Sequence, residues 1–172
     1  MSDPLDVISE QLKDEQGRNF DSPPLHLWQP ELSGDIAIRI AADGSWYHQG
    51  DPIKRESLRN LFASILRRED DGEYYLVTPA EKWRIQVDLH PLLVTDVEQR
   101  GGTLFLTLNT GRTLTVDSDH PLFLEPRQEN VAAVTLWHGL TALFSRSAWY
   151  RLVDLSSDDG VVRSGSFHLQ LQ

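Results

Sequence analysis

Residues 36–48 read IAIRIAADGSWYH, and this stretch decides the first part of the fold. An isoleucine stands at every second position from 36 to 40, which predicts a strand with one buried face. Asp43-Gly44 is a turn sequence, and Trp46 to His48 begin the returning strand. The stretch therefore predicts a β-hairpin.

An amphipathic helix is predicted directly after the hairpin. Asp51-Pro52 introduces it, because proline is well tolerated where a helix begins. Its apolar side chains stand at positions i, i+3, i+4, i+7 and i+8, the spacing of one helical face. They are Leu58, Leu61, Phe62, Ile65 and Leu66. We expect this helix to lie in the core and to end at the turn Asp70-Asp71-Gly72.

Part of this pattern occurs twice in the chain. Four residues recur at the same spacing: Trp46, Ile53, Arg55 and Leu61 in the first half become Trp137, Phe144, Arg146 and Leu152 in the second. An internal repeat indicates one supersecondary unit that is built twice. In both copies, a strand that carries the tryptophan is expected to lead into a helix that begins near the arginine.

The remaining hydrophobic patterns predict further strands and helices. Residues 3–16 are expected to form an amphipathic helix, followed by a linker with Pro23 and Pro24. Strands are predicted at 74–77, 83–87, 92–97, 103–108 and 112–116. After them we expect a long strand over 131–144 bent at Gly139, a helix capped by Ser145 or Ser147 with Trp149, Leu152 and Val153 on its inner face, and a closing strand with Phe167, Leu169 and Leu171.

These elements predict an α+β fold with two tandem repeats, each an antiparallel β-meander plus a helix. We expect an N-terminal helix and linker over residues 1–24, a first repeat over 25–91 and a second repeat over 92–172. The length suits one domain or two small halves that share a core. The seam between two such copies is a natural place for a site.

Composition excludes several classes of protein. The net charge of −10 opposes nonspecific binding to nucleic acid, although residues 54–84 carry seven basic against six acidic side chains and are nearly neutral. No apolar run is long enough for a membrane helix, and the N-terminus is not a signal peptide. The chain contains no cysteine, which excludes disulfides and cysteine-ligated zinc. We therefore expect a cytoplasmic protein that binds neither nucleic acid nor membranes.

Two long motifs carry a resemblance to a known family. They are DGSWYHQGDPIKR at residues 43–55 and YLVTPAEKWRI at residues 75–85, and the likeness extends to residues 139–155. The chain resembles the bacterial domain-of-unknown-function family 1285. This resemblance implies a cytoplasmic protein with a duplicated α+β core and a C-terminal half similar to pleckstrin-homology folds. It also implies a groove between the halves, for a nucleotide-like ligand in signal transduction, with no established reaction.

The first candidate site lies in the segment from Trp46 to Arg55. Trp46 offers a stacking surface, while His48 and Arg55, together with Lys54, offer contacts for an anionic or heterocyclic ligand. The alternative gives Trp46 to the core and Arg55 to an ion pair at a helix end. Because both residues recur in the second copy, a structural role explains them at least as well.

The second candidate site is the segment from Thr78 to Arg84. Here a loop fixed by Pro79 offers a hydroxyl, a carboxylate and two cations, and loops on a rigid scaffold often carry function. The groups are those of Thr78, Glu81, Lys82 and Arg84. The alternative is a solvated turn.

The sequence contains no recognisable catalytic, metal or cofactor motif. His90 and His120 each precede proline and are expected at strand ends rather than in a metal site. A nucleophile elbow and a phosphate-binding glycine loop are both missing. Our first hypothesis is a noncatalytic module that binds a small anionic or nucleotide-like molecule between the repeats. The alternatives are a protein-interaction adaptor, which uses an exposed strand or the N-terminal helix, and an enzyme that uses His48, Asp51 and Glu81.

Overall fold

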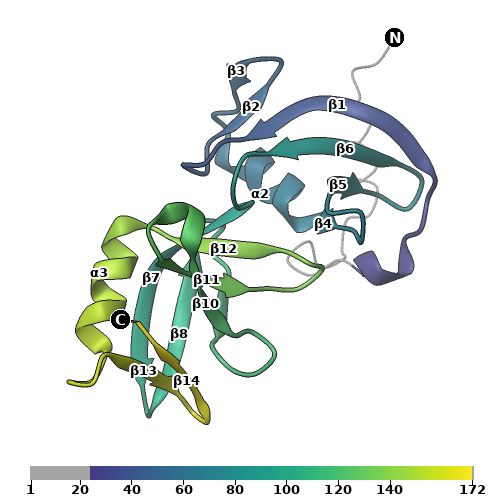
Figure 1. The fold of residues 1–172 in the computed structure, drawn as a ribbon. Helices are drawn as coiled ribbons and strands as arrows, with labels where there is room; N and C mark the ends of the chain where they lie inside the picture. Colours follow the sequence, from purple (N-terminus) through teal and green to yellow (C-terminus); the bar gives the residue numbers. More distant parts are fainter. Residues whose placement is uncertain (1–23, 172) are drawn as a thin grey trace. The chain divides into compact units, whose positions relative to one another are not determined.

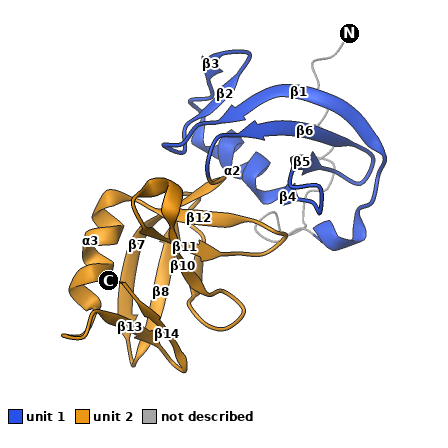
Figure 2. Ribbon diagram, viewed as in Figure 1, with its two compact units in different colours: residues 1–89 blue, residues 90–172 orange. Residues whose placement is uncertain are grey.

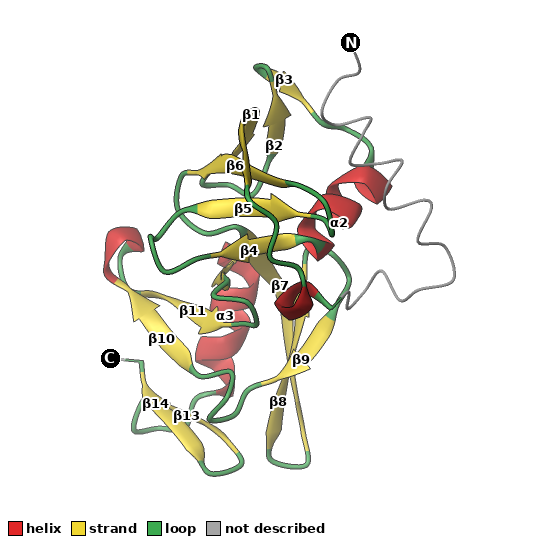
Figure 3. Cartoon of the chain, turned by 90° about the vertical axis from the view of Figure 1, so that its right-hand side faces the viewer, coloured by secondary structure: helices red, strands yellow, loops and turns green. Residues whose placement is uncertain are grey.

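The computed structural model describes residues 24–171, which form two compact units, one up to Leu89 and one from His90 onward (Figure 2). The predicted helix over residues 3–16 and most of the predicted linker lie outside the described residues. Each unit contains a six-stranded sheet and one α-helix (Figure 3). The predicted α+β fold with two tandem copies is confirmed. The likeness of the second half to pleckstrin-homology folds stays a prediction.

Unit 1 is built on a mixed sheet with the strand order β3-β2-β1-β6-β5-β4 (Figure 1). Its strands are β1 (Leu32–Ile40), β2 (Trp46–His48), β3 (Asp51–Pro52), β4 (Leu66–Arg68), β5 (Tyr74–Val77) and β6 (Lys82–Val87). A short 3-10 helix, η1 (Leu25–Leu27), precedes β1, and the helix α2 (Glu56–Ser64) joins β3 to β4.

The predicted hairpin is confirmed as β1 and β2. Ile38 pairs with His48 and Ile40 with Trp46, in antiparallel register. The isoleucines of β1 are buried, while Ala37 and Arg39 between them are exposed. Since cross-strand partners project to the same side of a sheet, Trp46 lies on the core side. The period-two pattern thus sets which face of the sheet is buried.

The helix α2 is shorter than its hydrophobic pattern predicts. It ends at Ser64, and Leu66 begins the strand β4, which pairs with Leu76 of β5. The turn at 70–72, expected at the helix end, joins β4 to β5 instead. The physical reason is that Ile65 and Leu66 are fully buried in this arrangement, so burial alone did not require them to continue the helix.

The central pair of unit 1 is parallel and irregular. Asp35 on β1 stands opposite Arg84 on β6, but the next registered pair is Arg39 with Gln86. Residues 36–38 of β1 therefore face a single residue, Ile85. Extra residues in one strand interrupt the hydrogen-bond ladder and bend that strand, and β1 is visibly curved in Figure 1. The interruption lies in the middle of the sheet.

Unit 2 contains a second mixed sheet with the order β10-β11-β12-β7-β8-β9. Its strands are β7 (Leu92–Arg100), β8 (Thr103–Leu108), β9 (Thr113–Thr115), β10 (Leu122–Glu125), β11 (Val131–Thr135) and β12 (Thr141–Phe144). A 3-10 helix, η2 (Pro126–Gln128), follows β10. The helix α3 (Arg146–Leu155) packs on β7 and β12, and the hairpin β13 (Val161–Ser164) and β14 (Phe167–Gln170) follows it.

The predicted meander and the second helix are confirmed in unit 2. β7, β8 and β9 pair in antiparallel order, as expected. Of the two serines proposed as the helix cap, Ser145 is the N-cap: its side chain accepts a hydrogen bond from the backbone N–H of Ala148. An N-cap of this kind satisfies one of the free N–H groups at the helix start.

The single long strand predicted over residues 131–144 is wrong. The segment forms the antiparallel hairpin β11 and β12, and Leu136 and Leu140 close its turn by a backbone hydrogen bond of 2.9 Å. His138 and Gly139 both have positive φ, 54° and 74°. Two consecutive residues of this kind reverse the chain. The turn was not predicted because the segment is apolar almost throughout. The strands β10 and β13 were not predicted either.

The two sheets share one topology, but the repeated residues are not equivalent within it. Counted from the first strand of its own unit, each sheet has the order 3-2-1-6-5-4, with a parallel pair formed by the first and last strands. The helix, however, follows the third strand in unit 1 and the sixth in unit 2. Trp46 lies on a second strand, whereas Trp137 lies between the fifth and sixth. The sequence repeat therefore marks a common way of entering a helix.

Candidate functional site

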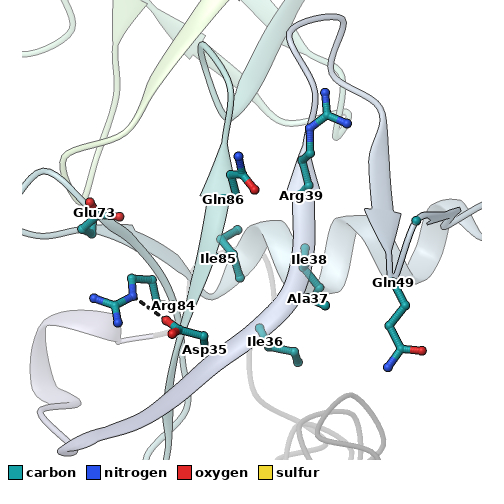
Figure 4. A pocket seen from close by; sticks show the side chains of 11 residues that line it. Asp35, Ile36, Ala37, Ile38, Arg39, Gln49, Glu73, Arg84, Ile85 and Gln86 are labelled. Carbon is teal, nitrogen blue, oxygen red and sulfur yellow. Dashed lines mark hydrogen bonds and ion pairs between the residues drawn. The ribbon is translucent and has the colours of Figure 1, made fainter.

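A hollow of about 410 Å³ lies on the exposed face of the unit 1 sheet, where β1 and β6 are out of register (Figure 4). It is lined by Asp35, Ile36, Ala37, Ile38, Arg39, Gln49, Gly50, Glu73, Arg84, Ile85 and Gln86. We call it the β1–β6 hollow. Ala37 stands between the charged residues Asp35 and Arg39 at the exposed positions of β1, and its small side chain leaves space there.

Arg84 lines one end of the hollow and pairs with Asp35 across the two strands. Its Nε donates to Oδ1 of Asp35 over 2.5 Å, and Figure 4 shows this contact. This hydrogen bond, with the charge of Arg84, lowers the pKa of the Asp35 carboxyl. Within the described residues, the Nη1 and Nη2 groups of Arg84 donate no hydrogen bond. They remain available to a ligand.

Arg39 lines the hollow on the same face of the sheet. Its pair with Gln86 is the next one in register after the pair of Asp35 with Arg84. Both Nε and Nη2 of Arg39 donate to Asp88, and these bonds lower the pKa of the Asp88 carboxyl. The guanidinium carbon also lies 5.9 Å from the centre of the Tyr47 ring, within range of a cation–π interaction. Nη1 of Arg39 has no bond to another described residue. The two guanidinium groups thus belong to one exposed sheet face.

The remaining polar groups of the hollow come from turns and strand ends. Gln49 and Gly50 form the turn between β2 and β3, both with positive φ, and the backbone N–H of Gln49 donates to the Ala37 carbonyl over 2.8 Å. Glu73 immediately precedes β5, and Gln86 lies on β6 beside Arg39. Each of these side chains is exposed.

The first predicted site is not assembled as expected. Trp46 is only 3% exposed and stacks on Phe62 of α2, with ring centroids 6.4 Å apart, so its ring is core and presents no surface to a ligand. His48 pairs with the buried Ile38 and thus belongs to the core side of β2. Arg55 is exposed at the N-cap of α2. The structural alternative is correct for Trp46, whereas Arg55 lies at the helix end but forms no ion pair within the described residues.

The second predicted site is divided as well. The hydroxyl of Thr78 is buried and accepts hydrogen bonds from the backbone N–H groups of Ala80 and Glu81, so it stabilises its own turn. The Glu81 carboxylate accepts from the Trp83 indole over 3.1 Å. Lys82 forms an ion pair of 2.9 Å with Glu69 and lies over the Tyr75 ring.

Of the seven predicted site residues, Arg84 lines the hollow and the other six do not. Trp46 and His48 lie on the core side of the sheet, opposite the face that carries Arg84. Sequence reasoning missed Arg39, although its position was visible: it is an outward residue of the predicted hairpin. The exposed small residue Ala37, between two charged positions, was the available sign of a hollow.

The acid–base set of the enzyme hypothesis is not gathered at the hollow. His48 and Asp51 are direct cross-strand partners on β2 and β3, whereas Glu81 is bonded to Trp83 in another turn. None of the three lines the β1–β6 hollow. Over residues 24–171, no group of three or more histidine, aspartate or glutamate side chains is placed to hold a metal ion.

A buried polar cluster lies in unit 2. Nδ1 of His90 lies 2.6 Å from the hydroxyl of Thr141, and its Nε2 lies 2.6 Å from Oε2 of Glu125. Arg127 donates to the same carboxylate from its side chain and its backbone N–H. Led by these Arg127 bonds, the contacts lower the pKa of Glu125 to about 2. The cluster joins β10 and β12 to the start of β7.

Comparisons with known proteins give one consistent result. Two family models match the chain: the N-terminal domain of DUF1285, a domain of unknown function, over residues 23–89, and the C-terminal domain of DUF1285 over residues 91–170. No curated protein gives a significant match. In the part of the chain that the structure describes, no helix has the length and apolar character needed to cross a membrane.

Two solved structures are similar to this chain. One is a DUF1285 family protein from Silicibacter pomeroyi DSS-3, with 37% identity and a TM-score of 0.79, covering 97% of this chain and 94% of that one. The other is a DUF1285 family protein from Shewanella baltica OS155, with 31% identity and a TM-score of 0.61, covering 71% of this chain and 94% of that one.

Proposed function

Because the chain belongs to the DUF1285 family, whose function is not known, we propose a function from its own site: a noncatalytic cytoplasmic module that binds a small molecule with an anionic group, nucleotide-like molecules included, and acts in signal transduction. The proposed site is the β1–β6 hollow, which unit 1 forms alone. A binding site at the junction of the two repeats stays a prediction.

The observation that carries this proposal is the pair Arg39 and Arg84 on one exposed sheet face, with a hollow between them. Guanidinium groups bind carboxylates and phosphates strongly because their N–H donors form a planar fork. The Asp35 bond uses only Nε of Arg84, which leaves the Nη donors for a ligand. A volume of about 410 Å³ also lies in the usual range for small-molecule sites.

The composition of the lining supports binding without turnover. The residues that line the hollow include no hydroxyl, thiol or imidazole side chain. Nucleophilic and acid–base catalysis depend mainly on such groups. Two carboxylates are present, but Asp35 is already paired with Arg84. A module that binds and does not react suits a role in sensing.

The experiment that tests the proposal is a thermal-shift and calorimetric screen of the full chain with AMP, inorganic phosphate and N-acetylglycine. A ligand that binds only the folded state raises the melting temperature by mass action. We expect at least one of these anions to do so and Arg84→Ala to remove the shift. The matched control is Arg163→Ala, which breaks another exposed Arg–Asp pair, that with Asp159 in unit 2.

Two results would overturn the proposal. One is a melting temperature that no anion changes. The other is a shift that Arg84→Ala and Arg163→Ala leave equally intact, because binding would then lie elsewhere. Copurification of one defined protein partner, together with the first result, would favour the adaptor hypothesis instead.

A further inference from the structure

The charges that line the β1–β6 hollow are balanced rather than uniformly positive. Arg39 and Arg84 supply two positive groups, Asp35 and Glu73 supply two negative groups, and Gln49 and Gln86 add two carboxamides. A ligand with several negative charges would meet both carboxylates as well as both guanidinium groups. Electrostatic complementarity therefore favours a ligand that carries both signs of charge.

The groups of opposite sign that remain available lie close together in the fold. Arg84 stands opposite Tyr75 on β5, and Glu73 lies two residues before Tyr75, on the same side of that strand. The bond and charge of Asp35, with a smaller effect from Glu73, raise the pKa of Arg84. Within the described residues, the Glu73 carboxylate accepts no hydrogen bond. Arg84 contacts Oδ1 of Asp35, and the second oxygen, Oδ2, accepts no bond from Arg84.

We infer that the hollow binds a small zwitterion of the amino-acid or short-peptide class, with its carboxylate on the Nη groups of Arg84 and its ammonium group at Glu73. This rests on the proposed function and names the ligand class of the same site. The fork of Arg84 matches a carboxylate, and a carboxylate of the protein is the natural partner of an ammonium group. The carboxamides of Gln49 and Gln86 supply donors and acceptors for a peptide bond.

The test uses three probes that share a central peptide bond and differ in their charged ends: glycylglycine, N-acetylglycine and glycylglycinamide. Glycylglycine carries both charges, N-acetylglycine only the negative one and glycylglycinamide only the positive one. Isothermal titration of the full chain should give an affinity for glycylglycine about tenfold above either of the others, a difference of about 1.4 kcal/mol, because each of the others lacks one charge-assisted hydrogen bond.

Two substitutions test the contacts of the two ends of the ligand separately. Arg84→Ala should weaken both glycylglycine and N-acetylglycine. Glu73→Gln should weaken glycylglycine about tenfold while N-acetylglycine binds equally well or better, because a repulsive charge is removed. Both side chains are solvent-accessible, and the circular dichroism spectrum and melting temperature of each variant confirm its fold.

The possible failures differ in meaning. N-acetylglycine or AMP could bind through Arg84 while glycylglycine binds no more tightly than they do. The inference of a zwitterionic ligand is then wrong, and the proposed anion site stands. If Glu73→Gln affects all probes equally, the assigned ammonium contact is wrong. If none of the probes binds, and AMP and phosphate do not bind either, the proposed function fails together with this inference.

Discussion

His90 and Glu125 are joined by a contact of 2.6 Å between Nε2 and Oε2, although both side chains are almost completely buried. Buried polar groups are tolerated when their hydrogen bonds are satisfied. Here the second nitrogen of His90 contacts Thr141, and Arg127 bonds the Glu125 carboxylate. Since His90 lies just before β7, the cluster holds the start of this strand to β10 and β12.

Replacing this carboxylate should destabilise unit 2. Glu125→Gln removes the charge that His90 and Arg127 contact, and hydrogen bonds to charged groups contribute about 1.5–3 kcal/mol each. We expect a loss of about 2–3 kcal/mol in urea unfolding. The matched control is Glu98→Gln, whose exposed pair with Arg100 should change stability by less than about 1 kcal/mol. Equal effects of the two substitutions would contradict a structural role for the cluster.

The same carboxylate should make stability depend on pH in the acid range. The pKa of Glu125 falls from its usual 4.5 to about 2 in the folded protein, because Arg127 and His90 bond the ionised form. A lowered pKa stabilises the folded state above pH 4.5, and this contribution is lost as the pH falls toward 2.

The measurement is the free energy of unfolding of the wild type minus that of Glu125→Gln, taken between pH 7 and pH 2. The difference should shrink as the pH falls from about 4.5 toward 2. Other carboxylates titrate in both proteins and cancel in the subtraction. A difference that stays constant down to pH 2 would contradict the lowered pKa.

Trp46 should matter for stability and not for ligand binding. Its ring stacks on Phe62 and is 3% exposed, so Trp46→Ala leaves a large cavity and should cost about 3–5 kcal/mol. Trp46→Phe keeps most of the packing and should cost less. In titrations with N-acetylglycine, Trp46→Phe should bind as the wild type does. A large loss of affinity in this folded variant would show that Trp46 contributes to ligand binding.

Arg55 should be replaceable with a gain in stability. It occupies the N-cap of α2 in an extended conformation, and its side chain makes no capping hydrogen bond. Aspartate at this position can accept from the free N–H groups of the first turn, which contributes about 0.5–2 kcal/mol. Arg55→Asp should therefore raise the urea midpoint, while Arg55→Ala should change it little. A loss of stability in Arg55→Asp would show that the arginine has a contact of its own.

Local patterns in the sequence predict much of the fold, and the pairing of distant strands explains most of what they miss. The isoleucines at 36, 38 and 40 define one face, so the hairpin and its buried side follow directly. The parallel pairing of Arg39 with Gln86 joins residues far apart in the chain, and nothing local predicts it. The hairpin turn at His138 was missed because apolar residues continue on both sides of it, so that Gly139 predicted a bend in one strand rather than a reversal of the chain.

The candidate site was predicted less well than the fold for the same reason. Arg84 was recognised as a charged residue near a turn, but its partner Asp35 comes from another strand. Arg39 was recognised only as the outward position of a strand. The register shift that brings these residues around a hollow is a property of β1 and β6 together. Single-segment patterns carry no information about it.

The parallel pair at the centre of each sheet has a mechanical consequence. In unit 1 the chain enters the sheet at the start of β1 and leaves it at the end of β6, and these strands run side by side in one direction. Tension between those two points would act along the strands and load the ladder hydrogen bonds together, in shear. The short pair β7 and β12 is in regular register and shares such a load evenly, whereas the longer pair of unit 1 is divided by its register shift into separate groups of bonds. Under stretching, the bonds on the two sides of the shift in unit 1 are therefore expected to be loaded unequally.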